Sequence, residues 1–416
     1  MDDVSEEEPT AEEGRAEFGL QRLRVRGFRS ALDVSIAPGR LCALVGEANA
    51  GKSNLLLAIR ALLDPTVRAL GVEDTFAGGA GEIAIDGTLV GGGELSLTSR
   101  PPDIARLDGG ARPPVAFLPG ELRTGAVLAS AGGLEGADPA VESLAREMTE
   151  QLGVDGDGAT APAMSLVNAI AASCDSGLCG LVLLIEEPEL YLRPQAQRYL
   201  YRLLRRFADA GSQVIYSTHS PSFLNVARLE ELALVQRHPS SGTTIMQPHP
   251  ITPDEDFRVL SEFDAERSEL FLARAALLVE GQTEKLAFPF VFDALGADPD
   301  REGISIVACG GKSNIPLFAR VCRAARVPFV AVYDRDAPTG RRPSASMRGL
   351  NARIAKLAGP EHTVMLIPDF EGAAGLVGHH HKPEHAWRRL RSLPPERMPA
   401  PLFDAVRRVL ALAREG

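Results

Sequence analysis

The feature that most constrains the fold of this chain is a glycine-rich octapeptide at residues 46–53, with the sequence G-E-A-N-A-G-K-S. An apolar run at residues 41–45 precedes it, and a helix-like segment at residues 54–62 follows it. Glycine adopts backbone dihedrals that let a loop curl around a polyphosphate, so that successive N–H groups point at its oxygens. A buried strand, this loop and a helix facing the phosphates together make a Walker A motif. The sequence therefore predicts a nucleotide-binding α/β domain.

The predicted nucleotide ligands lie within this loop and at the start of the helix. Lys52 is expected to reach the β- and γ-phosphates, and Ser53 to offer its hydroxyl to Mg²⁺. The other candidate nucleotide-binding residues are Gly46, Asn49, Gly51 and Asn54. The alternative is a chance glycine turn between a strand and a helix. Because strand, loop, Lys-Ser pair and helix all agree, we expect ATP and Mg²⁺ as cofactors.

A second apolar run, at residues 181–185, ends in the carboxylates Glu186 and Glu187. This pattern is typical of a Walker B strand. Glu186 is expected to hold Mg²⁺, and Glu187 to orient and deprotonate the attacking water. Side chains alternate in direction along a strand, so two adjacent carboxylates can serve different roles.

Residues 213–221, Q-V-I-Y-S-T-H-S-P, indicate a further buried strand that ends in a polar turn. His219 at this end could contact a γ-phosphate. Taken alone, it is better explained as a structural histidine with its hydrogen bonds satisfied. Its position after the two nucleotide motifs favours a catalytic role instead.

An acidic constellation follows in a different region. Three apolar runs at residues 275–279, 305–309 and 328–333 alternate with helix-like segments, which predicts a parallel βαβ sheet. The runs end at Glu280-Gly281, at Gly310-Gly311-Lys312 and at Asp334-Arg335-Asp336. Ligands of such sheets bind at the carboxyl ends of the strands. Clustered carboxylates repel one another unless a cation neutralises them, and hard oxygen ligands select Mg²⁺ or Mn²⁺.

These motifs resemble two known modules. The phosphate loop, the two carboxylates and His219, with an opening strand and turn at residues 20–30, resemble the ATPase core of ABC proteins, SMC proteins and RecF. That resemblance implies that His219 is the switch histidine and that two heads sandwich ATP, as in a homodimer. Glu280, Asp334 and Asp336 resemble the acidic residues of the Toprim domain of topoisomerases, primases and certain nucleases.

The order of the two modules is similar to that of the OLD (overcoming lysogenization defect) family of ATP-dependent nucleases. The matching stretches are V-E-G-Q-T-E at residues 279–284, G-G-K-S at residues 310–313 and D-R-D at residues 334–336. The resemblance implies an ABC-type ATPase head followed by a Toprim domain that cuts DNA. It covers roughly residues 20–375, and its weakest stretch is residues 66–180.

The OLD resemblance also implies a two-metal site. Glu280 and Glu284 would hold one side of it, and Asp334 and Asp336 the other. Two metal ions can stabilise both the attacking and the leaving oxygen of a phosphodiester. The further acidic and basic residues of the family pattern correspond here to Asp369, Glu371 and Lys382. For Glu284 a solvated helix face stays open as the alternative, and His379–His381 are better explained as a polar loop than as metal ligands.

The main departure of the sequence from the ATPase pattern is a missing stretch, and Glu186 in place of the commoner aspartate is a smaller one. The L-S-G-G-Q type stretch expected ahead of the Walker B strand is absent, and Ser165 stands near its place without the glycines. That stretch normally touches the γ-phosphate held by the partner head. Hydrolysis across a dimer is therefore in doubt, while nucleotide binding is not.

The expected organisation has four parts. An acidic, disordered tail at residues 1–17 precedes an ATPase domain at residues 18–265, a Toprim domain at residues 266–382 and a helical segment at residues 383–416. The stretch at residues 66–114 suggests small antiparallel strands. No heptad run separates the two nucleotide motifs, so we expect no long coiled-coil arm.

The net charge of −11 is unusual for a protein that binds DNA. Residues 1–17 contain eight acidic residues and one arginine, so they carry seven of these eleven charges. Three basic clusters stand against them: Arg22, Arg24, Arg26 and Arg29; Arg198, Arg202, Arg205 and Arg206; and Arg388, Arg389 and Arg391. For any single cluster a solvated face is slightly favoured over a DNA contact.

The sequence shows no membrane span, signal peptide or paired cysteines, and this predicts a cytoplasmic protein. No apolar run approaches the roughly 18–20 residues of a membrane span, and the acidic N-terminus does not resemble a signal peptide. Five cysteines without zinc-type pairing fit a reduced cytoplasm.

Two functions remain open. The first is an ATP-regulated DNA nuclease, in phage defence or DNA repair and with a helicase-like or defence partner. The second is a non-cleaving ATPase whose Toprim module only binds nucleic acid or a partner.

Overall fold

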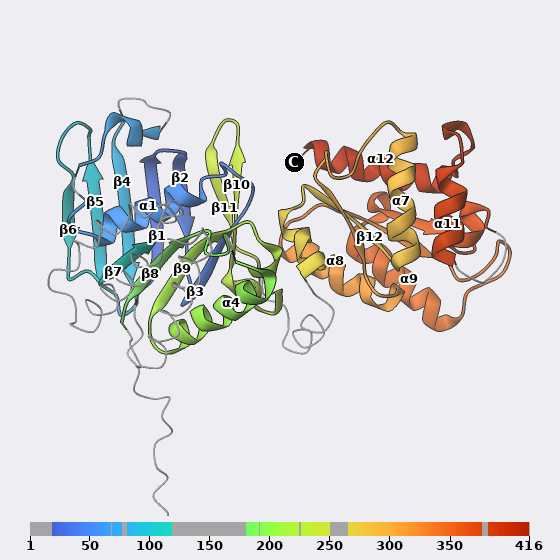
Figure 1. Ribbon diagram of the computed structural model, residues 1–416, viewed down its shortest axis with the longest axis horizontal. Helices are drawn as coiled ribbons and strands as arrows, with labels where there is room; N and C mark the ends of the chain where they lie inside the picture. The colour runs from blue at the N-terminus through green and yellow to red at the C-terminus, as the bar shows by residue number, and fades with distance from the viewer. Residues whose placement is uncertain are drawn as a thin grey trace, which may run out of the picture. The chain divides into compact units, whose positions relative to one another are not determined.

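The computed structural model describes residues 19–67, 69–76, 81–118, 180–190, 192–223, 226–249, 265–376 and 382–415 (Figure 1). The chain divides into two compact units, one of Met1–Phe223 with Glu231–Met246 and the other of Leu224–Glu230 with Gln247–Gly416. The expected tail at residues 1–17 and Ser165 lie outside the described residues. The predicted domain limits of 18–265, 266–382 and 383–416 stay predictions.

The first unit is built on one large mixed sheet. Its described strands, in spatial order, are β6 (Arg106–Gly109), β5 (Glu94–Ser99), β4 (Ile83–Leu89), β1 (Leu20–Phe28), β2 (Ala31–Ile36), β11 (Gly242–Met246), β10 (Leu232–His238), β3 (Leu41–Val45), β9 (Gln213–Thr218), β8 (Val182–Glu186) and β7 (Val115–Leu118). The strands from β6 to β10 are antiparallel to their neighbours, and the strands from β10 to β7 are parallel. The antiparallel β4, β5 and β6 confirm the small strands expected within residues 66–114.

The parallel part of this sheet holds the nucleotide motifs. Strands β3 and β9 are buried along their whole length, as continuous apolar runs in a parallel sheet predict. Helix α1 (Lys52–Leu63) contributes Leu56 to the same core as Leu44 of β3 and Ile215 of β9. Helix α4 (Pro194–Asp209) also packs against β9 and β3. Because β9 lies between β3 and β8, the ends of all three strands meet at one edge.

The second unit contains a four-stranded sheet in its described part, with every strand parallel (Figure 1). Its spatial order is β13 (Ile304–Ala308), β12 (Ala275–Val279), β14 (Phe329–Asp334) and β15 (Thr363–Leu366). The described helices are α6 (Ala265–Ser268), α7 (Gln282–Ala294), α8 (Ile315–Ala324), α9 (Ala345–Ala358), α10 (Phe370–Ala374), α11 (Lys382–Arg391) and α12 (Ala400–Glu415). The predicted βαβ arrangement and the helical pattern after residue 383 are confirmed.

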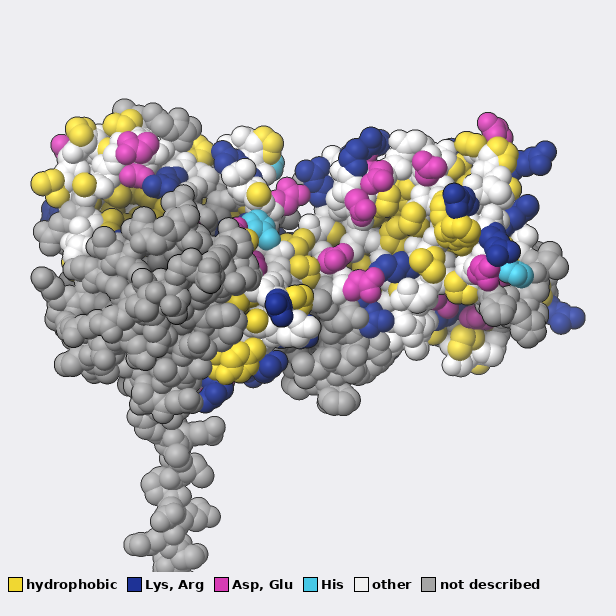
Figure 2. Space-filling model, in the orientation of Figure 1, with side chains coloured by type: hydrophobic (Ala, Val, Ile, Leu, Met, Phe, Trp, Pro, Cys, Tyr) yellow, Lys and Arg dark blue, Asp and Glu magenta, His cyan; other side chains and the backbone are white. Residues whose placement is uncertain are grey.

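Strand β12 lies directly beside β14, so the residues that follow these two strands are brought together. Helices α7 and α12 share one hydrophobic core with β12, in which Phe288 and Val406 are completely buried. On the visible face of this unit, Lys and Arg side chains are interspersed with Asp and Glu (Figure 2). Among the described residues, no helix combines the length and the apolar character needed to cross a membrane.

Candidate functional site

The backbone of residues 46–53 has the shape that its glycines predict. Gly51 adopts a φ of 107° at the N-terminus of α1. A Cβ atom on Gly51 would lie 2.1 Å from Thr243 Oγ1, and one on Gly46 would lie 2.0 Å from the carbonyl oxygen of Val235. Position 51 therefore requires glycine for conformation and for space, and position 46 requires it for space.

Lys52 points back into this loop. Its ammonium donates hydrogen bonds to the carbonyl oxygens of Gly46 and Glu47, at 2.9 Å each. Only 5% of the residue is exposed. Burial lowers the pKa of Lys52 to about 8, against the opposing effect of the Glu187 and Glu189 carboxylates. Lys52 is thus a desolvated cation held inside the loop, where an anionic ligand would stabilise its charge.

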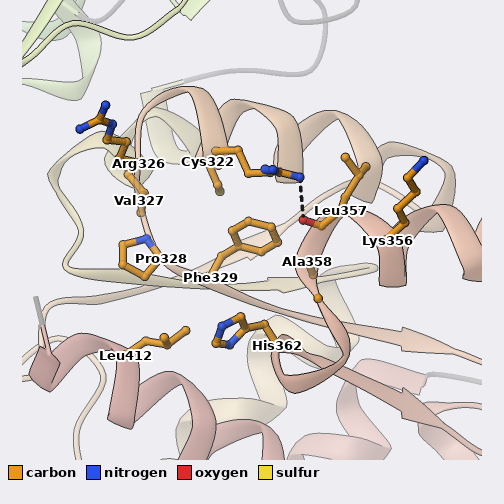
Figure 3. Close-up of a pocket in the computed structure, with 12 residues that line it drawn as sticks. Cys322, Arg326, Val327, Pro328, Phe329, Lys356, Leu357, Ala358, His362 and Leu412 are labelled. Carbon is orange, nitrogen blue, oxygen red and sulfur yellow. Dashed lines mark hydrogen bonds between the residues drawn. The ribbon is translucent and has the colours of Figure 1, made fainter.

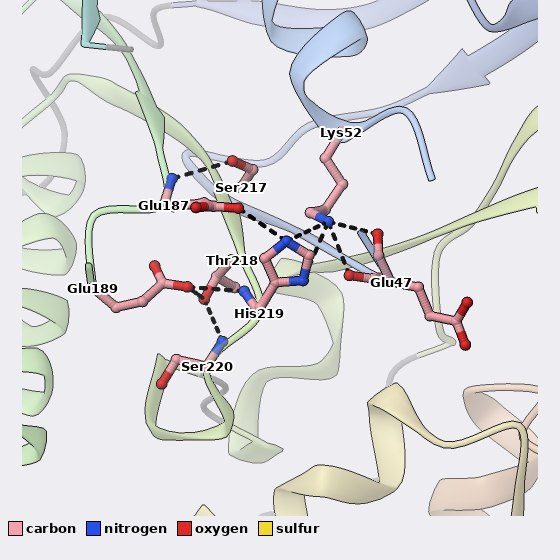
Figure 4. Close-up of polar contacts among 9 residues, drawn as sticks. Glu47, Lys52, Glu187, Glu189, Ser217, Thr218, His219 and Ser220 are labelled. Atoms are coloured by element: carbon pink, nitrogen blue, oxygen red, sulfur yellow. Dashed lines mark hydrogen bonds and ion pairs between the residues drawn. The ribbon is translucent and has the colours of Figure 1, made fainter. Parts of the chain in front are cut away.

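Lys52, His219 and Glu187 lie in one row (Figure 4). His219 Nε2 is 3.1 Å from Lys52 Nζ and 2.9 Å from Glu187 Oε1. Glu187 has a φ of 41°, which is uncommon outside glycine, and its N–H donates to the carbonyl oxygen of Ser217 at 3.0 Å. The structure therefore brings together side chains that follow β3, β8 and β9.

The other sequence-predicted nucleotide ligands lie around this row. Ser53 and Asn49 are exposed, and Glu186 is half-buried at the end of β8. Asn54 is turned aside, because its Nδ2 donates to Ser30 Oγ at 2.7 Å. The predicted roles of these residues stay predictions.

Sequence reasoning gave no role to Glu189, although the structure places it at the centre of this region. The residue is 7% exposed, and its Oε1 accepts hydrogen bonds from Thr218 Oγ1 at 2.7 Å and from the His219 N–H at 2.8 Å. Burial raises the pKa of this carboxyl group. Glu189 thus positions the backbone that carries His219. The only sequence signal was its place two residues after Glu187.

We expect Glu189→Ala to destabilise the protein by about 1–3 kcal/mol, because two buried donors lose their acceptor. Glu189→Gln should stay close to wild type, because an amide oxygen can accept both hydrogen bonds. Thermal unfolding of the two variants checks the stability, and the rate of ATP hydrolysis checks the position of His219. Equal stability of the alanine and glutamine variants would contradict this role.

A second group of polar residues follows the strands of the second unit. The backbone N–H of Asp334 donates to Glu280 Oε1 at 2.8 Å. Within the described residues, no hydrogen-bond partner contacts the buried Oδ1 atom of Asp334. Burial, opposed by that hydrogen bond and by Lys312, raises the pKa of Glu280 to about 7. Burial and the nearby carboxylates, Glu280 first, raise the pKa of Asp334 to about 8.

Lys312 is the second residue that the sequence interpretation left without a role. It follows β13 and is 7% exposed. Its ammonium donates to Asp336 Oδ2 at 2.5 Å and to the backbone carbonyl oxygen of Asp334. Asp336 itself has a φ of 59°. The Gly310-Gly311-Lys312 sequence was the signal for this contact, because it too follows a parallel strand.

The remaining predicted residues of this region surround Asp334. Glu284 is 8% exposed, and its Oε2 accepts from the Gly281 N–H at 3.2 Å, which caps α7. Asp369 Oδ1 accepts from the Gly372 N–H at 2.7 Å and caps α10. The carboxylates of Glu284, Asp369 and Glu371 each raise the pKa of Asp334. Lys382 begins α11, and its side chain lies outside the described residues.

The donor set was tested for its fit to a divalent cation. In the described part of the chain, no group of three or more His, Cys, Asp or Glu side chains has an arrangement that could hold a metal ion as it stands. The ammonium of Lys312 and backbone N–H groups contact several of the oxygens instead. The unpaired, buried Oδ1 of Asp334 nevertheless lies among carboxylates, and hard oxygen donors suit Mg²⁺ or Mn²⁺. The chemistry of these donors therefore suits such an ion, although the side chains as they stand do not enclose one.

A cavity of about 450 Å³ lies elsewhere in this unit (Figure 3). It is lined by the ends of α8 and α9 and by Phe329, which begins β14, whereas Asp334 ends that strand. Arg323, one of the lining residues, donates to the carbonyl oxygen of Leu357 at 3.5 Å. Leu357 lies at the C-terminal end of α9, where basic side chains commonly bind carbonyl oxygens. The cavity is therefore separate from the carboxylates.

Together, the fold and the two sites define a P-loop α/β unit and a parallel α/β unit with carboxylates at its strand ends. Residues 271–336 match the family described as "Overcoming lysogenization defect protein-like, TOPRIM domain". Residues 166–225 match the family described as "AAA domain, putative AbiEii toxin, Type IV TA system".

Two curated proteins are similar to this chain. An OLD nuclease of Thermus scotoductus is 39% identical over 216 residues, which is 46% of this chain and 40% of that protein. The Old nuclease of Escherichia phage P2 is 27% identical over 184 residues, which is 42% of this chain and 31% of that protein. The chain thus spans less than half the length of these relatives. These matches confirm the resemblance to the OLD family.

Two solved structures align with parts of this chain. The C-terminal region of the Burkholderia pseudomallei OLD protein is 18% identical and covers 34% of this chain and 98% of its own, with a TM-score of 0.29. The SMC head domain from Thermotoga maritima is 16% identical and covers 56% of this chain and 99% of its own, with a TM-score of 0.35.

Proposed function

We propose that this chain is an ATP-binding, metal-dependent DNA endonuclease of OLD type. The observation that carries the proposal is the buried, unpaired Oδ1 of Asp334 beside Glu280, at the carboxyl ends of adjacent parallel strands. The match of residues 271–336 to the OLD-like Toprim family supports it. The activity of the whole protein is a proposal, because the chain spans less than half the length of its curated relatives.

In this proposal Glu280, Asp334 and Asp336 hold Mg²⁺ or Mn²⁺, with Glu284, Asp369 and Glu371 as further carboxylates around them. When bound, the ions supply Lewis-acid stabilisation of the charge that develops on the scissile phosphate. Lys312 contacts Asp336, so it keeps this carboxylate in place and neutralises it until a cation binds. Lys382 is proposed as a further catalytic lysine.

In the first unit we propose that the loop at residues 46–53 binds ATP. Lys52 would contact the β- and γ-phosphates, while Ser53 and Glu186 would hold Mg²⁺. Glu187 would accept the proton of the attacking water. Its carboxylate oxygen lies 2.9 Å from His219 Nε2, so the histidine can orient it.

The proposed function is tested with purified full chain and supercoiled plasmid, linear duplex and single-stranded DNA. Each substrate is incubated with Mg²⁺ or with Mn²⁺, in the presence and absence of ATP. We expect cleavage that requires the metal ion and is changed by ATP. If every substrate stays intact under all conditions, the nuclease proposal is wrong.

A non-cleaving ATPase, whose Toprim-like unit only binds nucleic acid or a partner protein, is the second candidate. Two observations favour it: the Lys312 ammonium already contacts Asp336, and the described residues form no ready metal cluster. The two candidates differ in the assay above. Retained DNA binding with no cleavage in either metal would select the second.

The cellular setting is also proposed. We propose a homodimer, because two heads sandwich the nucleotide in ABC and SMC proteins. We also propose a helicase-like or defence protein as a partner, in phage defence or DNA repair. The buried cysteines Cys42, Cys309 and Cys322 form no disulfide, which supports a reducing cytoplasm.

A further inference from the structure

Helix α11 of the second unit carries the single tryptophan of the chain, Trp387. Its ring contacts the ring of Phe290 on α7, with 6.3 Å between the centroids and 80° between the planes. This contact holds α11 against α7, yet 39% of Trp387 is exposed. Leu286, one helical turn before Phe290 on α7, is 49% exposed. An exposed aromatic ring beside a second exposed apolar side chain favours a binding surface.

Arginines lie next to this ring. The Arg391 guanidinium is 4.9 Å from the centroid of the Trp387 ring, and Arg389 is exposed on the same helix. Among the described residues, no acidic side chain pairs with either of these two arginines. Arg388 differs from them, because it pairs with Glu384 at 2.5 Å. Figure 2 shows hydrophobic and basic side chains beside one another in the region of α7 and α11.

Helix α10 connects this surface with the carboxylates of the second unit. Asp369, which caps its first turn, is one of the carboxylates around Asp334. Gly375 lies at its other end, and the Arg389 guanidinium is 4.0 Å from the position that a Cβ atom on Gly375 would take. A helix of five residues is only about 8 Å long. The arginines of α11 therefore lie close to the carboxylates at which cleavage is proposed.

An aromatic ring flanked by arginines has the chemistry of a site for single-stranded nucleic acid. Proteins bind single strands by stacking bases on aromatic rings and on arginine guanidinium groups, while basic side chains contact the phosphates. In a duplex the faces of the bases are covered by their neighbours, so an indole cannot stack on them. An exposed apolar surface also suits a protein partner, but arginines without acidic partners beside it favour a polyanion.

We propose that Trp387, Arg389 and Arg391, the α11 platform, bind a single-stranded segment of DNA beside the carboxylates of the second unit. A base stacks on the exposed part of the indole or on the Arg391 guanidinium, and Arg389 contacts a phosphate. The platform thereby favours DNA with an unpaired stretch over a continuous duplex. It rests on the proposed function in taking DNA as the ligand, but it does not require that the carboxylates cleave the strand.

The single tryptophan makes the test direct, because the tryptophan emission of the full chain reports on residue 387 alone. The full chain is titrated in EDTA with oligothymidine of about 12 nucleotides, which lies within the usual site size, at about 0.05 M salt. We expect saturable quenching of the emission, which weakens at about 0.5 M salt. A blunt duplex with the same number of phosphates should quench much less at equal concentration.

Anisotropy of a labelled oligothymidine measures the affinity of the variants. Trp387→Ala should weaken binding about tenfold, as the loss of one base–aromatic stack predicts, and Trp387→Phe should restore most of the affinity. Arg389→Gln/Arg391→Gln should lower the slope of log Kd against log salt by up to about 1.4, at about 0.7 for each phosphate contact. Arg342→Gln/Arg353→Gln removes two exposed arginines of the same unit and should bind like wild type.

Emission that stays constant up to about 0.1 mM oligothymidine, the weak end of non-specific binding, would overturn the proposal, and this measurement needs no variant to fold. Equal quenching by the duplex and the single strand would overturn it as well. Emission that changes on dilution of the protein but not with DNA would identify an interface between copies of the chain, which also overturns it. Quenching without cleavage in any metal would support the platform and reject the nuclease, whereas cleavage without quenching would reject the platform alone.

Discussion

Asp334→Ala is expected to reduce DNA cleavage by about three orders of magnitude or more, because metal-assisted charge stabilisation supplies several kcal/mol of the barrier reduction. Oδ1 of Asp334 is buried without a hydrogen-bond partner, and a bound cation would supply that partner. The fold should survive the change, since the backbone of Asp334 makes the hydrogen bonds to Glu280 and Lys312, and alanine keeps them. Gel analysis of plasmid cleavage at matched protein concentrations measures the loss.

The control is Asp293→Ala, which removes an exposed aspartate of α7 in the same unit. Its cleavage rate and its thermal unfolding should match those of wild type. ATP binding should be unchanged in both variants, because the nucleotide loop lies on a different sheet. If wild type cleaves DNA and Asp334→Ala cleaves it equally fast, the site assignment is wrong, although the nuclease activity would stand.

The strands that carry both sites could be predicted because their apolar runs are continuous. Residues 41–45 and 275–279 were predicted as strands, and these are the limits of β3 and β12. A strand buried on both faces needs such a run, and a turn of glycines or carboxylates then marks its end. Helix α1 begins two residues earlier than predicted, since Lys52 already belongs to its first turn.

The contacts between strand ends could not be predicted, because they depend on which strands are neighbours in space. Glu189 accepts from the backbone of His219 only because β9 lies beside β8. Lys312 reaches Asp336 although β12 lies between their strands. Spacing along the sequence marks the ends of the strands but does not show which strand ends are neighbours.

The sequence alone also does not show whether the arginines of residues 22–29 contact DNA or lie on a solvated surface. In the structure Arg24 pairs with Asp33 at 2.7 Å, and Arg29 pairs with Asp74 at 2.7 Å. These acidic partners come from elsewhere in the sheet or from the loop beside it, so this cluster is largely a paired surface.

Lys52→Ala is expected to weaken ATP binding at least about 100-fold, because a charged donor to two phosphates is lost, at about 1.5–3 kcal/mol for each hydrogen bond. The loop itself should persist, since Gly46 and Gly51 set its shape. Titration with fluorescent ATP measures the affinity. Lys356→Ala, an exposed lysine of α9 in the second unit, is the control and should bind like wild type. Wild-type affinity in Lys52→Ala would exclude the loop as the nucleotide site.

The pH dependence of ATP binding tests the same lysine without changing the fold. Burial lowers the pKa of Lys52 to about 8, so the free protein holds the ammonium form below that pH and loses it above. The nucleotide phosphates favour the charged lysine, and they are fully ionised from about pH 7 upward. The dissociation constant of wild type should therefore stay nearly level from pH 6.5 to 7.5 and rise toward about tenfold per pH unit above pH 8. Lys52→Ala should lack this rise, because the titrating group is gone. A level profile up to pH 9.5 in wild type would show that the pKa of Lys52 in the free protein is not lowered to about 8, or that its ammonium does not take part in binding.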